Sequence, residues 1–341
     1  MQHMSLKLEP YHHIIDSYWY YADLLYLIQD VDKEKLWLIN HYTRLIGVDL
    51  EYKISIHFDF ITDYKQYMVS YYDCPFIEFF KINKKDILMN DFLKFVKEQI
   101  KQGYCILLLV DRECFENKNF LGRGYHQIMI YGYDDKAQRV YYCDNALGGK
   151  YQTDLYCSFD ELVQAYQMAK HRESTQDGFD DSIFLLKPTR CEGYELELDS
   201  IKRDLDDYLN INQVVPMRYP PFFKEKFING IHIYQRYIDI LDNILNETIE
   251  MAFEMRDIHN LWDHKKTMLV RLNYLHQNNY IDDSRLVKDY QAVEQGLLNF
   301  RNLFLRYHIT KNNQTLIRMS DILKRVNETE YNVLSEFLRI L

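Results

Sequence analysis

The period at which apolar residues recur changes partway along this chain of 341 residues, and that change limits the folds open to it. Up to about residue 190, apolar residues alternate with polar ones or form short unbroken runs, as in YCILLLVDRE over 104–113, which is typical of strands. From residue 224 onward they recur every three or four residues, which is typical of amphipathic helices. We therefore expect an α+β domain with an antiparallel sheet over residues 5–190, a connector over 191–223, and an all-α helical bundle over 224–341.

Local signals predict the elements inside these parts. Asp16 or Ser17 can cap the first helix, Ser158 and Glu161 have the spacing of a capping box, and Gly103 is a typical helix stop. The predicted helices cover 16–30, 86–103, 158–170, 197–210, 231–245, 253–277, 284–307 and 315–339. The predicted strands cover 52–60, 104–113, 126–134, 139–145 and 181–188, and the segment 34–47 is mixed or strand-like.

Charge and cysteine usage argue against several classes of protein. Lysine plus arginine number 41 against 51 acidic residues, and the net charge of −10 opposes binding to a phosphate backbone. No apolar run reaches the roughly 18–20 residues of a membrane span, and the first ten residues lack the apolar region of a secretory signal. The six cysteines have no metal-binding spacing. We expect a cytoplasmic protein with reduced thiols, no metal, and neither nucleic acid nor membrane as partner.

His126 and Asp144 are candidates for a catalytic pair. His126 begins a predicted strand after a glycine-rich turn, and Asp144 ends the next strand of the same hairpin. Antiparallel pairing around the turn DDKAQ predicts that the two lie within a residue or two of each other. A carboxylate there would fix the imidazole tautomer and stabilise its cation. The alternative is a buried histidine satisfied by a nearby carboxylate, which is the commoner role of such a pair.

Ser17 is the candidate nucleophile. It lies at the predicted start of the first helix, where backbone N–H groups can stabilise an oxyanion. Its alternative role is a plain helix cap, which is what serine does most often at this position. Among the cysteines, Cys105 is expected mid-strand, and Cys143 on the opposite face from Asp144 because side chains alternate along a strand. Cys74, Cys114 and Cys157 fall in loop-like segments and stay open as candidates.

The stretches LLLVDRE, GRGYHQIMIYGYDD and VYYCDN resemble the histidine and aspartate region of the butirosin-biosynthesis protein H family. A nucleophile on the first helix, a histidine opening a strand and an aspartate on the next strand is also the chain order of papain-like cysteine enzymes. The resemblance covers roughly residues 11–190. The helical part, with NGIHIYQRYIDIL and DIHNLWDHKKTMLVRLNYL, resembles the helical tail of relatives from nonribosomal-peptide clusters. Together these resemblances imply a papain-like N-terminal domain followed by the helical bundle.

The resemblance also implies a function. The founding activity of the family is transfer of an acyl group from an acyl-carrier protein to an amine, through a thioester on a cysteine, which implies an acyl- or peptidyl-carrier protein as the partner here. The phosphopantetheine arm of the carrier would be part of the substrate, and no separate cofactor is expected. For two of the residues placed at the site, another role is commoner: Asp111 as the cap of a turn, and Tyr18 as an aromatic residue of the core. The residues expected at the site are Ser17, His126 and Asp144 for catalysis, and Asp16, Tyr18, Asp111 and Tyr125 for substrate binding.

One position departs from the family pattern. The family has Asp-Cys followed by an aromatic residue, whereas this chain has Asp16-Ser17-Tyr18. Three explanations stay open: an engineered Cys→Ser replacement, a natural serine nucleophile that needs stronger help from a base, or a relative without catalytic activity. Three functions stay open as well. The first is an acyltransferase of antibiotic-type peptide metabolism, the second a papain-like peptidase or amide hydrolase, and the third a non-catalytic partner of a biosynthetic assembly line.

Overall fold

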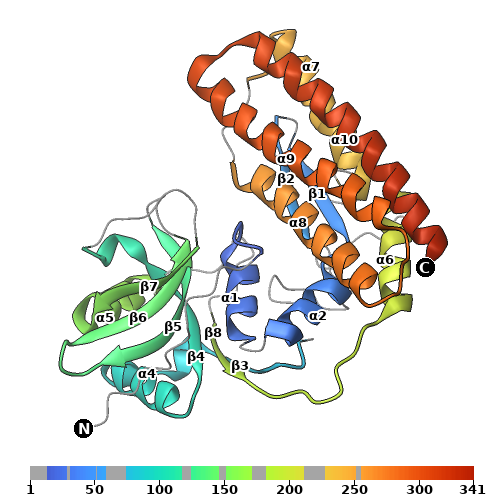
Figure 1. Ribbon diagram of the computed structural model, residues 1–341. Helices are drawn as coiled ribbons and strands as arrows, with labels where there is room; N and C mark the ends of the chain where they lie inside the picture. The colour runs from blue at the N-terminus through green and yellow to red at the C-terminus, as the bar shows by residue number, and fades with distance from the viewer. Residues whose placement is uncertain are drawn as a thin grey trace. The chain divides into compact units, whose positions relative to one another are not determined.

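The structure is a computed structural model of the whole chain (Figure 1). It describes residues 14–28, 31–50, 52–58, 74–116, 124–145, 151–170, 182–210, 227–250 and 255–341. The chain divides into two compact units, the first made of residues 1–34 and 66–193, the second of residues 35–65 and 194–341. The predicted class is confirmed at this level, because the structure combines antiparallel sheets with a C-terminal helical region.

The predicted domain boundaries and the all-α second part are wrong in one respect. Residues 35–65 belong to the second unit, although they lie inside the predicted first domain. They contain β1 (Leu45–Asp49) and β2 (Ile54–Phe58), and β1 pairs antiparallel with both β2 and β9 (Phe227–Asn229). The reason is that β1 finds one partner in the distant strand β9, which no local pattern reveals. The second unit therefore holds a three-stranded sheet of order β2-β1-β9 beside its helices.

The predicted connector and the mixed segment also take a different form. The mixed segment is mostly helical, because α2 (Val31–His41) precedes β1. Residues 194–210 of the predicted connector belong to the second unit, and the short helix predicted over 197–210 is confirmed there as α6 (Leu198–Asn210). Residues 211–223 of the connector, like residues 5–13 of the predicted first domain, lie outside the described residues.

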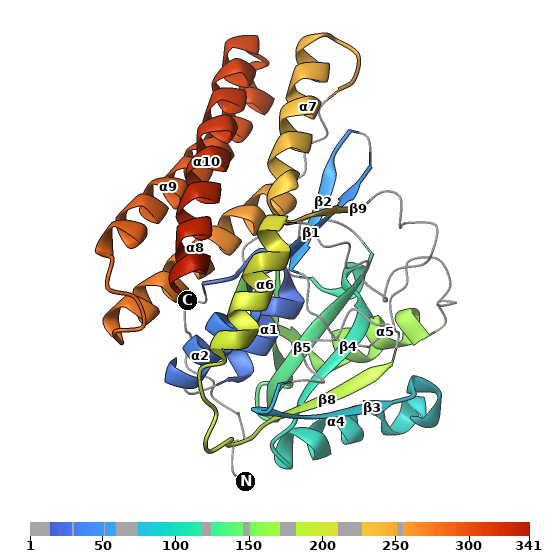
Figure 2. The ribbon, with the colours of Figure 1, turned by 90° about the vertical axis from the view of Figure 1, so that its right-hand side faces the viewer.

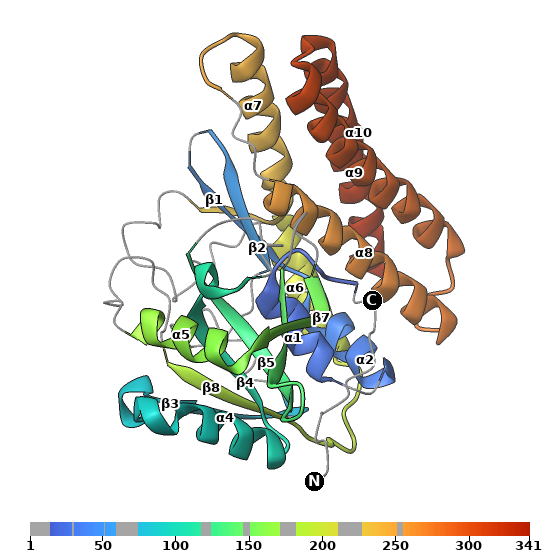
Figure 3. The same cartoon turned by 90° about the vertical axis from the view of Figure 1, so that its left-hand side faces the viewer.

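The first unit is built on a six-stranded antiparallel sheet of order β3-β8-β4-β5-β6-β7. Its strands are β3 (Ile77–Ile82), β4 (Cys105–Asp111), β5 (Tyr125–Asp134), β6 (Arg139–Asn145), β7 (Tyr151–Ser158) and β8 (Ile183–Pro188). Its helices are α1 (Trp19–Leu27), α4 (Phe92–Lys101) and α5 (Phe159–Lys170), with short 3-10 turns at Lys84–Asp86, Met89–Asp91 and Arg112–Cys114. Helix α1 packs against β6 and β8, and α4 and α5 lie on the opposite face of the sheet (Figure 3).

The central strand β4 explains why helices cover both faces of this sheet. All seven of its residues are buried, as the unbroken apolar run predicts. On one face its side chains join those of α4 and α5 in a single apolar core, where Phe92 stacks on Tyr166 with ring centroids 3.8 Å apart. Burying each such large apolar side chain contributes about 1.5–3 kcal/mol.

Two of the predicted end signals are confirmed. Glu161 Oε2 accepts a hydrogen bond from Ser158 N at 2.6 Å, and Ser158 Oγ accepts one from Glu161 N at 3.2 Å, which is the reciprocal capping box. Helix α4 ends at Lys101, and the predicted stop Gly103 follows its C-cap with a φ of +87°, a left-handed conformation that glycine adopts without strain.

The helices of the second unit follow the predicted ranges closely (Figure 2). They are α7 (Ile233–Leu245), α8 (Met255–Gln277), α9 (Ser284–Thr310) and α10 (Asn313–Ile340). Asp283 caps α9 and Asn312 caps α10, each accepting a hydrogen bond from the backbone two residues on. Among the described residues, the helices are too short or too polar to span a bilayer.

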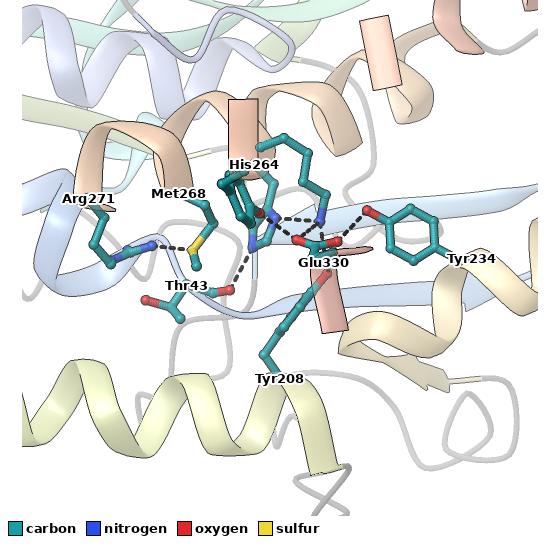
Figure 4. Close-up of polar contacts among 9 residues, drawn as sticks. Thr43, Tyr208, Tyr234, His264, Met268, Arg271 and Glu330 are labelled. Atoms are coloured by element: carbon teal, nitrogen blue, oxygen red, sulfur yellow. Dashed lines mark hydrogen bonds and ion pairs between the residues drawn. The ribbon is translucent and has the colours of Figure 1, made fainter. Parts of the chain in front are cut away.

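A buried polar cluster, which we call the Glu330 centre, lies inside the helices of the second unit (Figure 4). It consists of Tyr208, Tyr234, His264, Lys265, Tyr290 and Glu330. Its ion pair joins Lys265 Nζ to Glu330 Oε1 at 2.8 Å, and both side chains are fully buried. The members come from α6, α7, α8, α9 and α10, so one carboxylate ties five helices together.

Candidate active site

The hairpin β5–β6 brings His126 and Asp144 together. Met129 pairs with Cys143, and continuing that register by one residue places Asp144 opposite Ile128, two residues from His126 on the same face. Such diagonal neighbours are within side-chain reach across a sheet. His126 Nδ1 lies 3.0 Å from Asp144 Oδ1, so the pair sits where the count along the hairpin predicts.

The surroundings of His126 fix which ring nitrogen carries the proton. Besides Asp144, Nδ1 lies 2.8 Å from the carbonyl oxygen of Gln127, and a carbonyl can only accept a hydrogen bond. Nδ1 must therefore be the protonated nitrogen of the neutral ring, and Nε2 carries the lone pair. A histidine in this tautomer can accept a proton at Nε2 and return it later.

Arg112 is a member of the site that the sequence analysis missed. Its guanidinium nitrogen Nη1 lies 3.0 Å from Asp144 Oδ2, and Asp144 has 0% of its surface exposed. Asp144 Oδ1 also accepts a hydrogen bond from Asn145 N at 2.7 Å. The sequence signal for Arg112 is its position as a cation directly after the buried strand β4. Strand β4 pairs with the strand of His126, because Val110 is opposite His126.

Asp111 and Tyr125, two of the predicted substrate-binding residues, flank this site. Asp111 accepts a hydrogen bond from Glu113 N at 3.0 Å and caps the 3-10 turn Arg112–Cys114, so its carboxylate serves the turn. Tyr125 is opposite Asp111 in the β4–β5 register and is 38% exposed. Because side chains alternate along a strand, its ring and that of His126 leave opposite faces.

Helix α1 begins at Trp19, two residues later than Ser17. Its N-cap is Tyr18, with an extended backbone and no side-chain cap, so the predicted capping by Asp16 or Ser17 is wrong. The carbonyl of Tyr18 instead accepts hydrogen bonds from the backbone N–H groups of Tyr21 and Ala22. Ser17 therefore does not serve as the N-cap of this helix. Only 3% of its surface is exposed.

The residues on both sides of Ser17 contact the strands that carry the His–Asp pair. The Trp19 ring meets the His126 ring edge-on, with centroids 6.1 Å apart. Asn145 Nδ2 donates to the carbonyl oxygen of Asp16 at 3.5 Å. The segment 16–19 is thus fastened beside the start of β5 and the end of β6, and Ser17 lies between its two attachments. Tyr18 is buried and packs on Tyr20, as expected of a core aromatic.

Five of the six cysteines are poor alternatives to Ser17. Burial raises the pKa of Cys105, Cys143 and Cys157, and that of Cys143 is raised strongly. The pKa of Cys114 is raised as well, by burial and then by the charges of Asp111 and Glu113. A raised pKa disfavours the thiolate, which is the reactive form. Cys74 is buried.

Asp23 is a buried acid on α1, behind the site. It is 1% exposed and accepts a hydrogen bond from the hydroxyl of Tyr151. Burial raises its pKa well above the ordinary 3.8; the Tyr151 hydrogen bond lowers it, and the charge of Asp144 raises it further. Asp23 therefore holds its proton more tightly in the folded protein than in the unfolded chain.

This raised pKa predicts a pH-dependent effect of Asp23→Asn. Between about pH 4 and the raised pKa, the folded state binds one proton more than the unfolded state at this position, so the free energy of unfolding falls as the pH rises. Asparagine keeps an acceptor for Tyr151 and removes the titration. We expect Asp23→Asn to raise the melting temperature at neutral pH, by roughly 2–4 °C for each kcal/mol gained in the free energy of unfolding. At about pH 4 the melting temperature is expected to change little.

Calorimetry of the full chain across this pH range would test that expectation. Asp154→Asn on β7, which replaces an exposed acid of the same unit, is the matched control and is expected to show no such trend. A difference between Asp23→Asn and the wild type that stays constant with pH would contradict the assignment.

Comparison with known proteins adds no family. No family model matches the chain, and no curated protein matches it. Function is therefore inferred from the arrangement of Ser17, Arg112, His126 and Asp144.

Proposed function

We propose that the first unit is an acyltransferase centre with a papain-like arrangement of nucleophile helix and sheet. Residue 17 would take an acyl group from a carrier-protein thioester and pass it to an amine. The observation that carries the proposal is the position of His126 Nδ1 between two acceptors, Asp144 Oδ1 and the Gln127 carbonyl, which leaves Nε2 as the basic nitrogen. The attachment of Asp16 and Trp19 beside this pair supports residue 17 as its nucleophile.

The reaction has two halves. In the first, His126 Nε2 takes the proton of the Ser17 hydroxyl as Oγ forms a bond to the thioester carbonyl carbon. The C–S bond then breaks, and the thiol leaves with the proton from Nε2. In the second half an amine attacks the Ser17 ester and gives its proton to Nε2. The C–O bond breaks and Oγ recovers the proton.

Other groups hold this machinery in place. Asp144 keeps the ring oriented and stabilises its cation in both halves. The backbone N–H of residue 17 would help to hold the oxyanion of each tetrahedral intermediate. The carrier protein with its phosphopantetheine arm and an amine acceptor are the proposed partners, in the cytoplasm. Tyr125 is exposed at the same end of the sheet, but its ring leaves the face opposite to His126, so it is not part of the proposed centre.

Ser17→Cys is the experiment that tests the proposal. A thiol is more acidic and more nucleophilic than an alcohol, so this variant is expected to accumulate an acyl adduct on incubation with an acyl-pantetheine thioester. Intact mass spectrometry would show the added acyl group, and peptide mapping would place it on residue 17. Ser17→Ala is the matched control and is expected to remain unmodified.

Adding an amine separates transfer from hydrolysis. An adduct that is stable in buffer and disappears with formation of the amide supports the transferase. Release of the free acid at the same rate with and without amine supports the hydrolase in its place. Absence of any adduct in folded Ser17→Cys would contradict both enzymatic functions and favour a non-catalytic partner protein.

A further inference from the structure

The side chain of Arg112 makes an ion pair that the proposed chemistry does not by itself require. Arg112 Nη1 contacts Asp144 Oδ2, whereas His126 Nδ1 contacts Asp144 Oδ1, each at 3.0 Å. The guanidinium and the imidazole thus contact different oxygens of the same carboxylate. The Asp144 side chain is fully buried, and only 7% of the Arg112 side chain is exposed.

The backbone around Arg112 holds it in this position. Arg112 follows the last residue of β4, and its N–H donates to the carbonyl oxygen of Gly124 at 3.1 Å. Gly124 has a φ of +97°, which glycine adopts readily, and it immediately precedes β5. The cap by Asp111 fixes the turn from the other side. Arg112 is therefore anchored to the same strand start that carries His126.

The ion pair offsets the cost of burying the Asp144 carboxylate. Removing a carboxylate from water costs several kcal/mol unless a counter-charge and hydrogen bonds replace the lost solvation. The Nδ1–H tautomer of the imidazole brings no charge to Asp144, whereas the guanidinium supplies a counter-charge at Oδ2. Arginine also has a rigid planar group, which restrains the rotation of a carboxylate better than a single flexible ammonium does.

We propose that Arg112 is a positioning residue: by holding Asp144 Oδ2 it directs Oδ1 at His126 and keeps the imidazole in the Nδ1–H tautomer. This inference rests on the proposed function for its catalytic consequence. The tautomer itself is a property of the resting protein, and it can be measured whether or not the protein transfers an acyl group.

Heteronuclear NMR of the imidazole nitrogens tests the tautomer directly. The chain has 12 histidines, so the His126 signals are identified as those missing from His126→Asn. The wild type is expected to show Nδ1 protonated and Nε2 unprotonated. In Arg112→Ala the Asp144 carboxylate can turn away from Nδ1, which leaves the Gln127 carbonyl as the remaining acceptor there, so the ring is expected to shift partway toward a mixture of tautomers. Arg139→Ala is the matched control, because Arg139 lies in the same sheet and stacks over Tyr156 away from the site.

The acylation assay tests the catalytic consequence. In the Ser17→Cys background, Arg112→Ala is expected to slow adduct formation by roughly 10- to 100-fold, the loss typical when a group that orients a functional residue is removed. Added guanidinium ion is expected to restore part of the rate, which a general loss of folding would not allow. Arg112→Lys keeps the charge and serves as the second variant if Arg112→Ala folds poorly. Its rate of adduct formation is expected to lie between that of the parent protein and that of Arg112→Ala.

Two outcomes are distinguishable. If Arg112→Ala and Arg112→Lys keep the wild-type tautomer and a rate within about twofold of the parent, the inference is overturned. If none of the Ser17→Cys proteins forms an adduct, the proposed function fails, and the tautomer measurement still decides the role of Arg112.

Discussion

His126→Ala in the Ser17→Cys protein is expected to slow formation of the acyl adduct by about 10²- to 10⁴-fold, the usual contribution of a positioned base. The reason is the single basic nitrogen that the structure leaves on this ring. Asp144 and the Gln127 carbonyl both occupy Nδ1, so Nε2 is the nitrogen available for proton transfer. Stopped incubations with an acyl-pantetheine thioester, read by intact mass, give the rate constants.

The loss is expected to depend on which nucleophile residue 17 carries. A thiol is a few per cent ionised near neutral pH without help, whereas an alcohol supplies almost no alkoxide. His126→Ala should therefore cost more when Ser17 is kept than when it is replaced by cysteine. Raising the pH should restore part of the rate in the Ser17→Cys, His126→Ala protein, because added hydroxide generates thiolate without a base.

A matched control separates this effect from a general loss of structure. His276→Ala removes a histidine of the second unit whose Nδ1 contacts a backbone carbonyl, as His126 does. It is expected to leave acylation unchanged. A His126→Ala protein that is folded and acylates within a few-fold of its parent would remove His126 from the proposed mechanism.

The features that sequence could predict are those set by neighbours along the chain. The period of the long helices, the capping box at Ser158 and the buried run of β4 all appear where expected. The hairpin made the proximity of His126 and Asp144 predictable as well, because a short turn fixes the register of two adjacent strands. Each of these depends on residues fewer than about 20 positions apart.

The features that sequence could not predict depend on distant partners. Strand β1 is completed by β9, about 180 residues away, and this pairing assigns the segment 35–65 to the second unit. The start of α1 differs from the prediction because the carbonyl of Tyr18, rather than a side chain of Asp16 or Ser17, accepts the first hydrogen bonds of the helix. The role of Arg112 depends on Asp144, which lies two strands away in the sheet, so only the tertiary structure joins the two residues.

Glu330→Ala is expected to lower the free energy of unfolding of the second unit by about 3–5 kcal/mol, the usual cost of removing one partner of a buried ion pair. Glu330 Oε1 accepts from Lys265 at 2.8 Å and from Tyr290 at 2.5 Å. Its Oε2 accepts from Tyr208 at 3.2 Å and from Tyr234 at 2.5 Å. One truncation thus leaves a buried ammonium without its counter-charge and takes an acceptor from three buried phenols.

Denaturant unfolding of the full chain measures this loss, and its pH dependence identifies Lys265 as the cause. Burial lowers the pKa of Lys265, and the attraction of Glu330 partly offsets that effect. Without Glu330 the pKa of folded Lys265 falls further, so the stability lost by the variant grows as the pH falls below the pKa of Lys265 in the folded wild type, which itself lies below the ordinary 10.5, and shrinks as the pH is raised through it. Glu328→Ala, at an exposed position on the same helix, is expected to change stability by less than about 0.5 kcal/mol.

A double-mutant cycle separates the ion pair from the rest of the Glu330 centre. Lys265→Met removes the buried cation, and Nζ also donates to Tyr208 at 2.8 Å and to His264 Nδ1 at 2.9 Å, so this change alone is costly. Once Lys265 is methionine, Glu330→Met no longer strands a charge. The double variant is therefore expected to lose at least about 1 kcal/mol less than the sum of the two single losses. Additive losses would mean that the three tyrosine hydroxyls, and not the ion pair, account for the role of Glu330.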